Sequence, residues 1–219
     1  MVKPARPNSI YVVAGVNGAG KSSVISAPFI REGLDIFNPD VETRSLMQAN
    51  PELPLDEANS LAWNQGRAML EMAVEQGLNF AFETTLGGQT ITGILTRALA
   101  LGQQVRLLYV GLEGPELHIA RVRTRVAAGG HDVPEERIRR RYDSSRDNLI
   151  TLLPRLVELR LFDNSEDADP LTGAEPQPVE VLRMLNGAII ECLRLGHVPN
   201  WAKPIVATAL ELPHTPPEK

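Results

Sequence analysis

A complete phosphate-binding pattern lies near the start of the chain. Residues 15–22 read G-V-N-G-A-G-K-S and satisfy the pattern G-x-x-x-x-G-K-[S/T] in full. Glycines at these spacings let the backbone turn its N–H groups inward around phosphate oxygens. The pattern predicts that ATP binds here, with GTP the less favoured nucleotide, through residues in and just after it: Gly15, Asn17, Gly18, Ala19, Gly20, Lys21, Ser22 and Ser23.

Two side chains of this phosphate loop (residues 15–22) carry specific chemistry. We expect Lys21 to reach the β and γ phosphates and the Ser22 hydroxyl to ligate Mg²⁺, while the start of the following helix adds its dipole. A chance glycine-rich turn is the alternative. Against it, residues 10–14 predict a buried strand before the loop and residues 22–29 a helix after it, which is the context that the motif requires.

Two carboxylates directly follow predicted strands. Asp40 comes after a short strand over residues 34–37, and it could take the proton of an acceptor hydroxyl, cap a helix over residues 41–48, or do both. Glu83 comes after a strand over residues 79–82, and it could bind Mg²⁺ through water, hold a substrate hydroxyl or anchor a loop. Because ligands of parallel sheets bind at the carboxyl ends of strands, both side chains should converge on the phosphate loop.

A basic segment, here called the lid, spans residues 121–141. Its cationic or titratable members are Arg121, Arg123, Arg125, His131, Arg137, Arg139, Arg140 and Arg141. Arg121 and Arg125 stand four residues apart and share one helix face, and small kinases use such arginines to neutralise a transferring phosphoryl group. A solvated basic face, or one paired with Glu135, Glu136 and Asp143, is the alternative.

Strands and helices alternate through the first two thirds of the sequence. Apolar runs predict further strands over residues 105–110 and up to 161–162, and helices are expected over 56–76, 90–101, 115–128 and 134–157, the last bent or broken near Pro154. This alternation predicts an α/β fold: a P-loop NTPase-like parallel sheet flanked by helices, with a helical lid at about residues 115–157.

The C-terminal part of the sequence has another character. Residues 165–177 predict an exposed loop, and Asn186-Gly187 between two apolar runs predicts a β-hairpin, with a helix as the alternative for the same stretch. We therefore expect a core over residues 1–165, a C-terminal extension over 166–212 and a disordered tail over 213–219.

Composition narrows the classes of function. The formal net charge of −5 is unfavourable for sequence-independent nucleic-acid binding, which needs a basic surface. The single cysteine, Cys192, permits no intrachain disulfide and no cysteine-based zinc site. No apolar run is long enough for a membrane span, and the basic residues Lys3 and Arg6 precede a run too short for a signal peptide, so a cytoplasmic protein is expected.

Motifs beyond the phosphate loop give the chain a family resemblance. They are residues 38–40 (N-P-D), 82–85 (F-E-T-T), 121–126, 129–134 (G-G-H-D-V-P), 141–142 and 161–165. This ordered series is more specific than the loop alone, and over residues 9–165 the chain resembles the zeta toxin family of P-loop kinases. No Walker B strand, no L-S-G-G-Q signature and no N-K-x-D base-reading motif points to a motor, transporter or GTPase instead.

The resemblance implies a kinase acting on a hydroxyl of a nucleotide-sugar, best known as the 3′-hydroxyl of the amino sugar in UDP-N-acetylglucosamine. It implies Asp40 as the catalytic base, Glu83 as the acid that holds the substrate, and Arg121 as a phosphate-binding arginine. Thr84 and Thr85, beside Glu83, are expected to share in acceptor binding.

The second lid arginine of that family has no direct counterpart. By spacing it falls near His131, which we expect among the acceptor contacts, and Arg125 or one of residues 139–141 could take its place. With Lys21, Asp40 and Arg121, Arg125 completes the expected catalytic set.

A kinase of a small molecule is the leading interpretation, with an antitoxin protein as a candidate partner. The rival interpretation is a nucleotide-dependent binding protein or switch, with slow hydrolysis and a protein partner. A kinase consumes ATP only with a specific acceptor, whereas a switch hydrolyses ATP without one.

Overall fold

A seven-stranded sheet forms the centre of the computed structural model, which describes residues 8–25, 34–166 and 177–213. Its strand order is β2-β3-β1-β4-β5-β6-β7; pairings from β2 to β5 are parallel, and β6 and β7 are antiparallel. The strands are β1 Ser9–Ala14, β2 Ile36–Phe37, β3 Phe80–Thr84, β4 Gln104–Gly111, β5 Glu158–Asp163, β6 Val179–Leu185 and β7 Ala188–Cys192. The predicted α/β fold with a mostly parallel sheet is confirmed.

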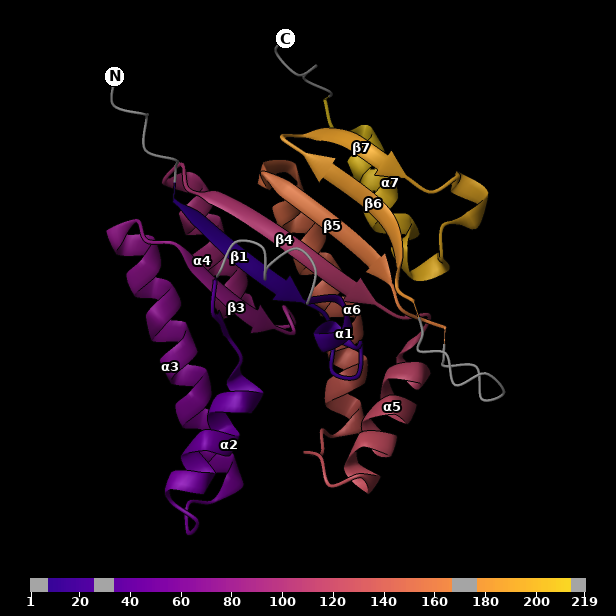
Figure 1. Cartoon of the computed structure of the whole chain (residues 1–219). Helices are drawn as coiled ribbons and strands as arrows, with labels where there is room; N and C mark the ends of the chain where they lie inside the picture. Colours follow the sequence, from indigo (N-terminus) through magenta and orange to yellow (C-terminus); the bar gives the residue numbers. More distant parts are fainter. Residues whose placement is uncertain (1–7, 26–33, 167–176, 214–219) are drawn as a thin grey trace.

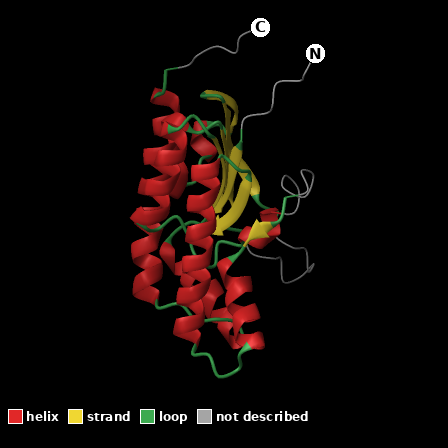
Figure 2. Ribbon diagram, turned by 90° about the vertical axis from the view of Figure 1, so that its left-hand side faces the viewer, coloured by secondary structure: helices red, strands yellow, loops and turns green. Residues whose placement is uncertain are grey.

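Most of the helices cover one face of this sheet (Figure 2). They are α1 Lys21–Ile25, α2 Pro39–Ala49, α3 Leu55–Gln76, α4 Gln89–Ala100, α5 Pro115–Ala127, α6 Glu135–Leu152 and α7 Lys203–Glu211. In Figure 1, α2 and the start of α3 lie on one side beyond the sheet, and α5 and the start of α6 lie on the other. The carboxyl ends of the parallel strands therefore face the space between two pairs of helices.

The two faces of the sheet carry hydrophobic clusters of unequal size. The larger cluster packs α3, α4, α6 and α7 against one face and includes Leu70, Leu95, Leu149 and Ile205. The smaller one joins Val24 of α1 to Val13, Leu108, Val110 and Phe162 on the other face. Burial of this apolar surface is the main force that fixes the strands and their loops in place.

Three local details differ from the sequence-based expectations, and the break expected near Pro154 is confirmed. The strand predicted over residues 34–37 is limited to Ile36–Phe37. Helix α6 ends at Leu152 and a 3₁₀ turn follows at Leu153–Arg155, because proline cannot donate the next helical hydrogen bond. Helix α2 is capped by Asn38 and not by Asp40, since the Asn38 side chain accepts hydrogen bonds from the backbone of Asp40 and Val41. Helix α7 had no counterpart in the sequence analysis.

The C-terminal hairpin extends the same sheet. Asn186 and Gly187 have φ angles of 50° and 77°, the left-handed values that a two-residue hairpin turn requires, and they join β6 to β7. Strand β6 pairs with β5, and α7 packs on the larger core. The predicted hairpin is thus present; the parts of the predicted loop and tail at residues 167–176 and 214–219, and the end of the first predicted helix at 26–29, lie outside the described residues.

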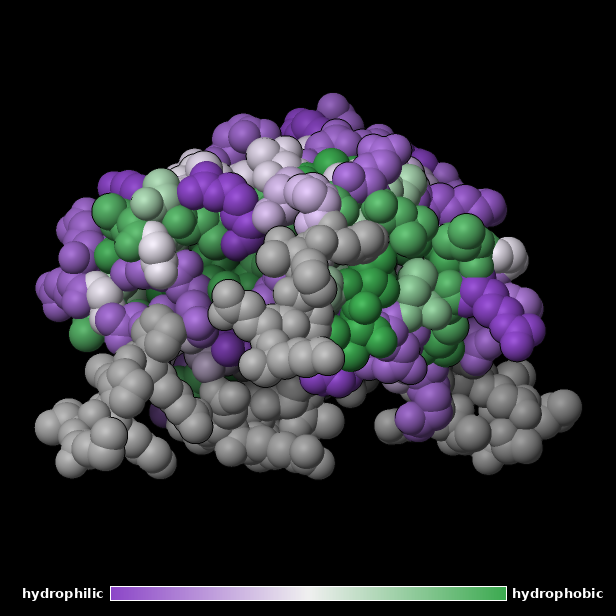
Figure 3. All heavy atoms as spheres, turned by 90° about the horizontal axis from the view of Figure 1, so that it is seen from above, coloured by the Kyte–Doolittle hydropathy of each residue, from purple (hydrophilic) through white to green (hydrophobic). Residues whose placement is uncertain are grey.

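The surface mixes polar and apolar residues. Seen from above, hydrophobic residues interrupt a largely hydrophilic exterior (Figure 3). Exposed large apolar side chains such as Leu101 and Leu195 are a normal part of a protein surface. Within the described part of the chain, no helix combines the length and the apolar character that a membrane crossing demands.

Candidate nucleotide and acceptor site

The phosphate loop has the backbone shape that its glycines predict. Gly15 and Gly18 adopt φ angles of 148° and 82°, where other residues are strained. A Cβ on Gly15 would lie 2.4 Å from the Val110 carbonyl oxygen, and one on Gly18 would lie 2.7 Å from the His118 carbonyl oxygen. The loop therefore fits closely against β4 and α5, and only glycine is compatible with both positions.

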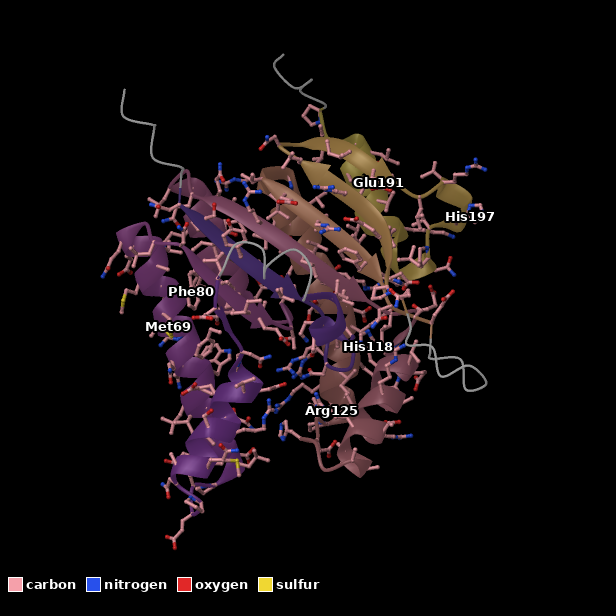
Figure 4. The ribbon with its side chains drawn as sticks, in the orientation of Figure 1. Met69, Phe80, His118, Arg125, Glu191 and His197 are labelled. Carbon is pink, nitrogen blue, oxygen red and sulfur yellow. The ribbon has the colours of Figure 1, made fainter. Side chains whose placement is uncertain are left out.

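Three side chains from distant parts of the sequence hold this loop. His118 contacts the Asn17 carbonyl through Nδ1 at 2.9 Å, Arg141 donates to Asn17 Oδ1 at 2.8 Å, and Asn164 donates to the Ala19 carbonyl at 2.9 Å. Figure 4 shows His118 on α5 close to the loop, with Arg125 further along the same helix. The loop is thus braced from α5, from α6 and from the end of β5.

His118 is held in its neutral form at physiological pH. It is 1% exposed, and burial lowers the pKa of His118 to about 4, with the charges of Lys21 and Arg121 acting in the same direction and the Asn17 hydrogen bond acting against it. A neutral imidazole that carries its proton on Nδ1 donates to the Asn17 carbonyl. His118 therefore acts on the loop as a hydrogen-bond donor without adding charge beside the phosphate site.

A chain of polar contacts joins the phosphate loop to α2. Lys21 Nζ donates to the Gly15 carbonyl at 2.8 Å and lies 3.3 Å from Glu83 Oε1. The other carboxylate oxygen, Glu83 Oε2, accepts a 2.7 Å hydrogen bond from Asn38 Nδ2. Asn38 Oδ1 in turn accepts from the backbone N–H of Asp40 at 2.8 Å. Glu83 and Asn38 therefore connect the lysine that faces the nucleotide with the helix that carries Asp40.

These residues open onto a cleft of about 620 Å³. It is bounded by the phosphate loop, the end of β3, α2, one face of α3 and the start of α6. Of the residues that the sequence nominated, Asn17, Lys21, Asp40, Glu83, Thr84, Thr85 and His131 line it. The structure thus brings the expected donor and acceptor residues to one cavity, with the Asp40 side chain exposed to solvent within it.

The arginines of the lid divide into two groups. Arg137 and Arg141, on successive turns of α6, line the cleft. Arg121 donates to the Glu166 carbonyl and Arg125 to the His131 carbonyl, and neither is among the residues that line this cleft. Arg123 pairs with Glu135, as the salt-bridged alternative for this segment anticipated, and Arg139 pairs with Glu116, which that alternative did not include.

The environment of Arg141 is unfavourable for a positive charge, because the side chain is partly buried and other arginines lie nearby. Burial lowers the pKa of Arg141 from its ordinary value, Arg137 and Arg140 lower it further by repulsion, and Asp40 opposes these effects by attraction. The side chain also packs so closely on Gly87 that a Cβ there would lie 2.7 Å from Arg141 Cγ. A phosphate group in the cleft would relieve the repulsion between these arginines.

Helix α6 also holds the loop that follows β3. Ser144 and Ser145 donate to the carbonyls of Gly87 and Thr85 at 2.9 and 2.7 Å, and Asn148 donates to the Leu86 carbonyl at 2.8 Å. One helix therefore carries two arginines of the cleft and fixes the loop beside Thr84 and Thr85. The sequence analysis missed this role, for which a run of small polar residues after the arginines was the available signal.

A Mg²⁺ ion would find one nominated ligand at the phosphate loop. Ser22 is exposed in the first turn of α1, while the side chain of Ser23 lies outside the described part. Within the described residues, no group of three or more His, Cys, Asp or Glu side chains could hold a metal. Mg²⁺ in kinases keeps several waters and takes one or two protein oxygens plus the phosphates, so a single hydroxyl is compatible with a Mg-ATP site.

Comparison with known proteins places this site in a family. The sequence profile of the AAA domain family AAA_33 matches residues 10–146, which include the phosphate loop, Asp40, Glu83 and both cleft arginines. The chain belongs to this family. An uncharacterized protein of Haemophilus influenzae is 31% identical over 136 residues, which are 62% of this chain and 93% of that protein.

Solved structures share the fold at low sequence identity. The complex of AvrRxo1-ORF1 with AvrRxo1-ORF2 is similar to this chain with a TM-score of 0.61 at 18% identity, covering 97% of this chain and 67% of the other. A structure from the PezAT toxin–antitoxin system of Streptococcus pneumoniae has a TM-score of 0.53 at 16% identity, covering 74% and 70%. The protein therefore has a P-loop kinase-like fold.

Proposed function

We propose that the protein is an ATP-dependent kinase that transfers the γ-phosphoryl group to a hydroxyl of a small molecule. The observation that carries this proposal is the shared cleft, which both Lys21 of the phosphate loop and the exposed Asp40 line, and in which Glu83 and Asn38 connect Lys21 to the backbone N–H of Asp40. A carboxylate that lines a cleft wide enough for a small molecule can take the proton of an acceptor hydroxyl bound there. A nucleotide-sugar is the acceptor class that the resemblance to zeta toxin kinases implies.

In the proposed reaction, the acceptor hydroxyl oxygen attacks the γ-phosphorus, and the bond between that phosphorus and the β–γ bridging oxygen breaks. Asp40 takes the hydroxyl proton, ADP leaves, and the acceptor becomes a phosphate ester. Glu83 orients the acceptor, together with Thr84, Thr85 and His131, which line the same cleft. Lys21 exchanges its contacts with Gly15 and Glu83 for the β and γ phosphates.

Charge on the transferring group is stabilised by cations of the lid. We assign this role to Arg137 and Arg141 because they line the cleft, and we keep Arg121 and Arg125, which the sequence nominated, as candidates on α5. A preorganised donor of this kind contributes roughly 10²–10³-fold to turnover. Mg²⁺, bound with ATP and held by Ser22, would supply further charge neutralisation.

A screen of small molecules tests this proposal. The protein is incubated with Mg-ATP and a pool of nucleotide-sugars, sugars and nucleosides, and mass spectrometry identifies any compound that gains one phosphate. We expect one acceptor class to be converted, and Asp40→Asn to lower turnover by roughly 10²–10⁴-fold with little change in ATP affinity. Normal turnover in Asp40→Asn would refute its role as the base.

A protein partner is the second part of the proposal. AvrRxo1-ORF1 was solved with AvrRxo1-ORF2, and PezAT is a toxin–antitoxin system, so two proteins of similar fold form assemblies. An antitoxin-like partner of this chain would bind to the purified kinase and lower its acceptor-dependent ATP consumption. Acceptor-independent hydrolysis together with nucleotide-dependent partner binding would instead favour the switch.

A further inference from the structure

One wall of the cleft is a single face of helix α3 that the proposed phosphoryl transfer does not use. Its residues are spaced three or four apart and therefore lie on the same side of the helix. They are Asp56, Asn59, Ser60, Trp63, Asn64 and Arg67, and all of them line the cleft. This wall stands across the cavity from the start of α6, so it would meet the part of the acceptor that lies away from the transferred phosphate.

Trp63 is the most conspicuous residue of the wall. It is 45% exposed although it lines a concave surface, whereas Trp201, the other tryptophan of the chain, is 2% exposed in the core. The Arg67 guanidinium lies 5.8 Å from the centre of the Trp63 ring, within the range of a cation–π contact. An aromatic face fixed in this way offers a platform on which a flat ring can stack.

The charges of the wall argue against an anionic ligand at this end of the cleft. Arg67 is engaged by both carboxylate oxygens of Glu71, at 2.8 and 2.9 Å, which offset its positive charge. Asp56 adds a negative charge to the same face. The other cations that line the cleft are Lys21 of the phosphate loop and Arg137 and Arg141 of α6. A phosphate or carboxylate would therefore favour the α6 side, and a neutral group would favour α3.

The polar side chains of the wall are oriented for hydrogen bonding. Asn59 Oδ1 accepts from the Thr43 hydroxyl at 3.1 Å, which sets the direction of its amide group. Asn64 Nδ2 donates to the Ser60 carbonyl at 2.9 Å, which fixes the Asn64 amide in the same way. Two oriented amides next to an aromatic platform can bind the hydroxyl or amide edges of a ring that stacks on Trp63.

We infer that the inner face of α3 binds an uncharged, hydroxyl-bearing ring of the acceptor, stacked on Trp63. The inference rests on the proposed kinase function, because it names the class of acceptor for the same cleft. Two kinds of compound could supply such a ring: a nucleoside, through its base and ribose, or a sugar or cyclitol. Trp63 is accordingly a specificity-determining residue, and the chemical step does not depend on it.

Ligand-observed NMR with the full chain and a non-hydrolysable Mg-ATP analogue tests the inference. The neutral probes are uridine, N-acetylglucosamine and myo-inositol, and the anionic probes are citrate and glucose 6-phosphate. We expect at least one neutral ring to bind more tightly than citrate, and Trp63→Leu to weaken that binding by about tenfold. Leu61→Ala is the matched control, because Leu61 is 46% exposed on the same helix and does not line the cleft.

The outcomes separate this inference from the kinase proposal. Binding of uridine alone assigns the platform to a base, and binding of N-acetylglucosamine or myo-inositol assigns it to a sugar or cyclitol; either supports the inference when Trp63→Leu weakens it and Leu61→Ala does not. Absence of binding by all three neutral probes, or equal binding to Trp63→Leu, overturns it. Phosphorylation of an acyclic or wholly anionic acceptor would also overturn it while leaving the kinase proposal intact.

Discussion

The phosphate loop and the lid differ in how directly their sequences determine their geometry. The loop takes its shape from its own glycines, at φ angles that few other residues adopt, and its neighbours leave no space for a Cβ on Gly15 or Gly18. The lid is rich in arginines, but which of them reach the cleft depends on how α5 and α6 pack. Arg137 and Arg141 face it, while Arg123 and Arg139 form ion pairs elsewhere.

The number of arginines in a segment therefore does not show which of them can stabilise the transferring phosphoryl group. In the lid, the carboxylates of Glu116 and Glu135 engage two of the arginines, and backbone carbonyls engage Arg121 and Arg125. What distinguishes Arg141 is its half-buried position between Asn17 and Asp40, with other arginines nearby.

Replacement of Arg141 should have the largest effect on turnover. Arg141→Ala removes a cation of the cleft and a contact to the phosphate loop, so we expect turnover to fall roughly 10²–10³-fold. Arg139→Ala is the matched control on the same helix, and it should change turnover little because Arg139 pairs with Glu116 on the exterior. Steady-state kinetics with an identified acceptor measures both. A larger loss in Arg121→Ala than in Arg141→Ala would assign the main lid role to α5.

His118 should make the bracing of the loop sensitive to pH. Its pKa is about 4 in the folded chain and near its ordinary 6.5 in the unfolded chain, so the unfolded state binds more protons between these values. The stabilisation is complete above about pH 6.5 and is lost as the pH falls toward 4, by about 3 kcal/mol in the free energy of unfolding. Denaturant unfolding of wild type and His118→Asn at a series of pH values checks this. Identical pH slopes for the two proteins would contradict it.

Asn38 offers a test of the link between the loop and α2. Asn38→Asp keeps a side chain that can cap α2, but it places a carboxylate oxygen where Nδ2 now donates to Glu83. We expect turnover to fall by about 10- to 100-fold, since one charge-assisted hydrogen bond contributes about 1.5–3 kcal/mol. The effect on thermal stability should be smaller. Asn38→Ser, which caps the helix without the repulsion, is the control. Equal activity of Asn38→Asp and wild type would exclude a positioning role.

Substitution of Trp201, which lies in the C-terminal extension, should have the smallest effect on the phosphate loop. Its indole Nε1 donates to Asp163 at 2.8 Å, beside Asn164, which holds the Ala19 carbonyl of the loop. Trp201→Phe keeps an aromatic ring against Gly111 and loses this hydrogen bond, so we expect a loss of about 1 kcal/mol in stability. Calorimetric ATP titration should show a change in affinity of no more than a few-fold. An unchanged unfolding free energy would show that this contact does not stabilise the end of β5.

Much of the fold could be predicted because it depends on local patterns. Apolar runs predicted the central strands, the helix expected over residues 56–76 ends at Gln76 as predicted, and Asn186-Gly187 predicted the hairpin turn. Helix α7 was missed because its residues adopt a definite position only through packing on the larger core. Turns and strands can be predicted from short stretches of sequence, whereas the face of a helix that becomes buried depends on tertiary packing.

In the candidate site, too, some residues could be predicted from local sequence and others only from tertiary packing. Lys21, Asp40 and Glu83 were nominated from their places after strands, and the cleft unites them because parallel strands end at one edge of the sheet. Asn38 was noted only as part of the motif at residues 38–40, and Trp63 was not nominated, since their roles depend on contacts between segments that are distant in the sequence. Which arginines of α6 face the cleft was likewise decided by helix packing.

The destination of the γ-phosphoryl group shows most directly whether the protein is a kinase or an acceptor-independent ATPase. Wild-type protein is incubated with Mg²⁺, ATP labelled in the γ-phosphate and the small-molecule pool, and the label is separated into inorganic and organic phosphate; Lys21→Ala serves as the blank. We predict that the label appears in an organic phosphate ester with wild type and not with Lys21→Ala. Label found only in inorganic phosphate, at a rate that is the same with and without the pool, would contradict the assignment of the protein as a kinase.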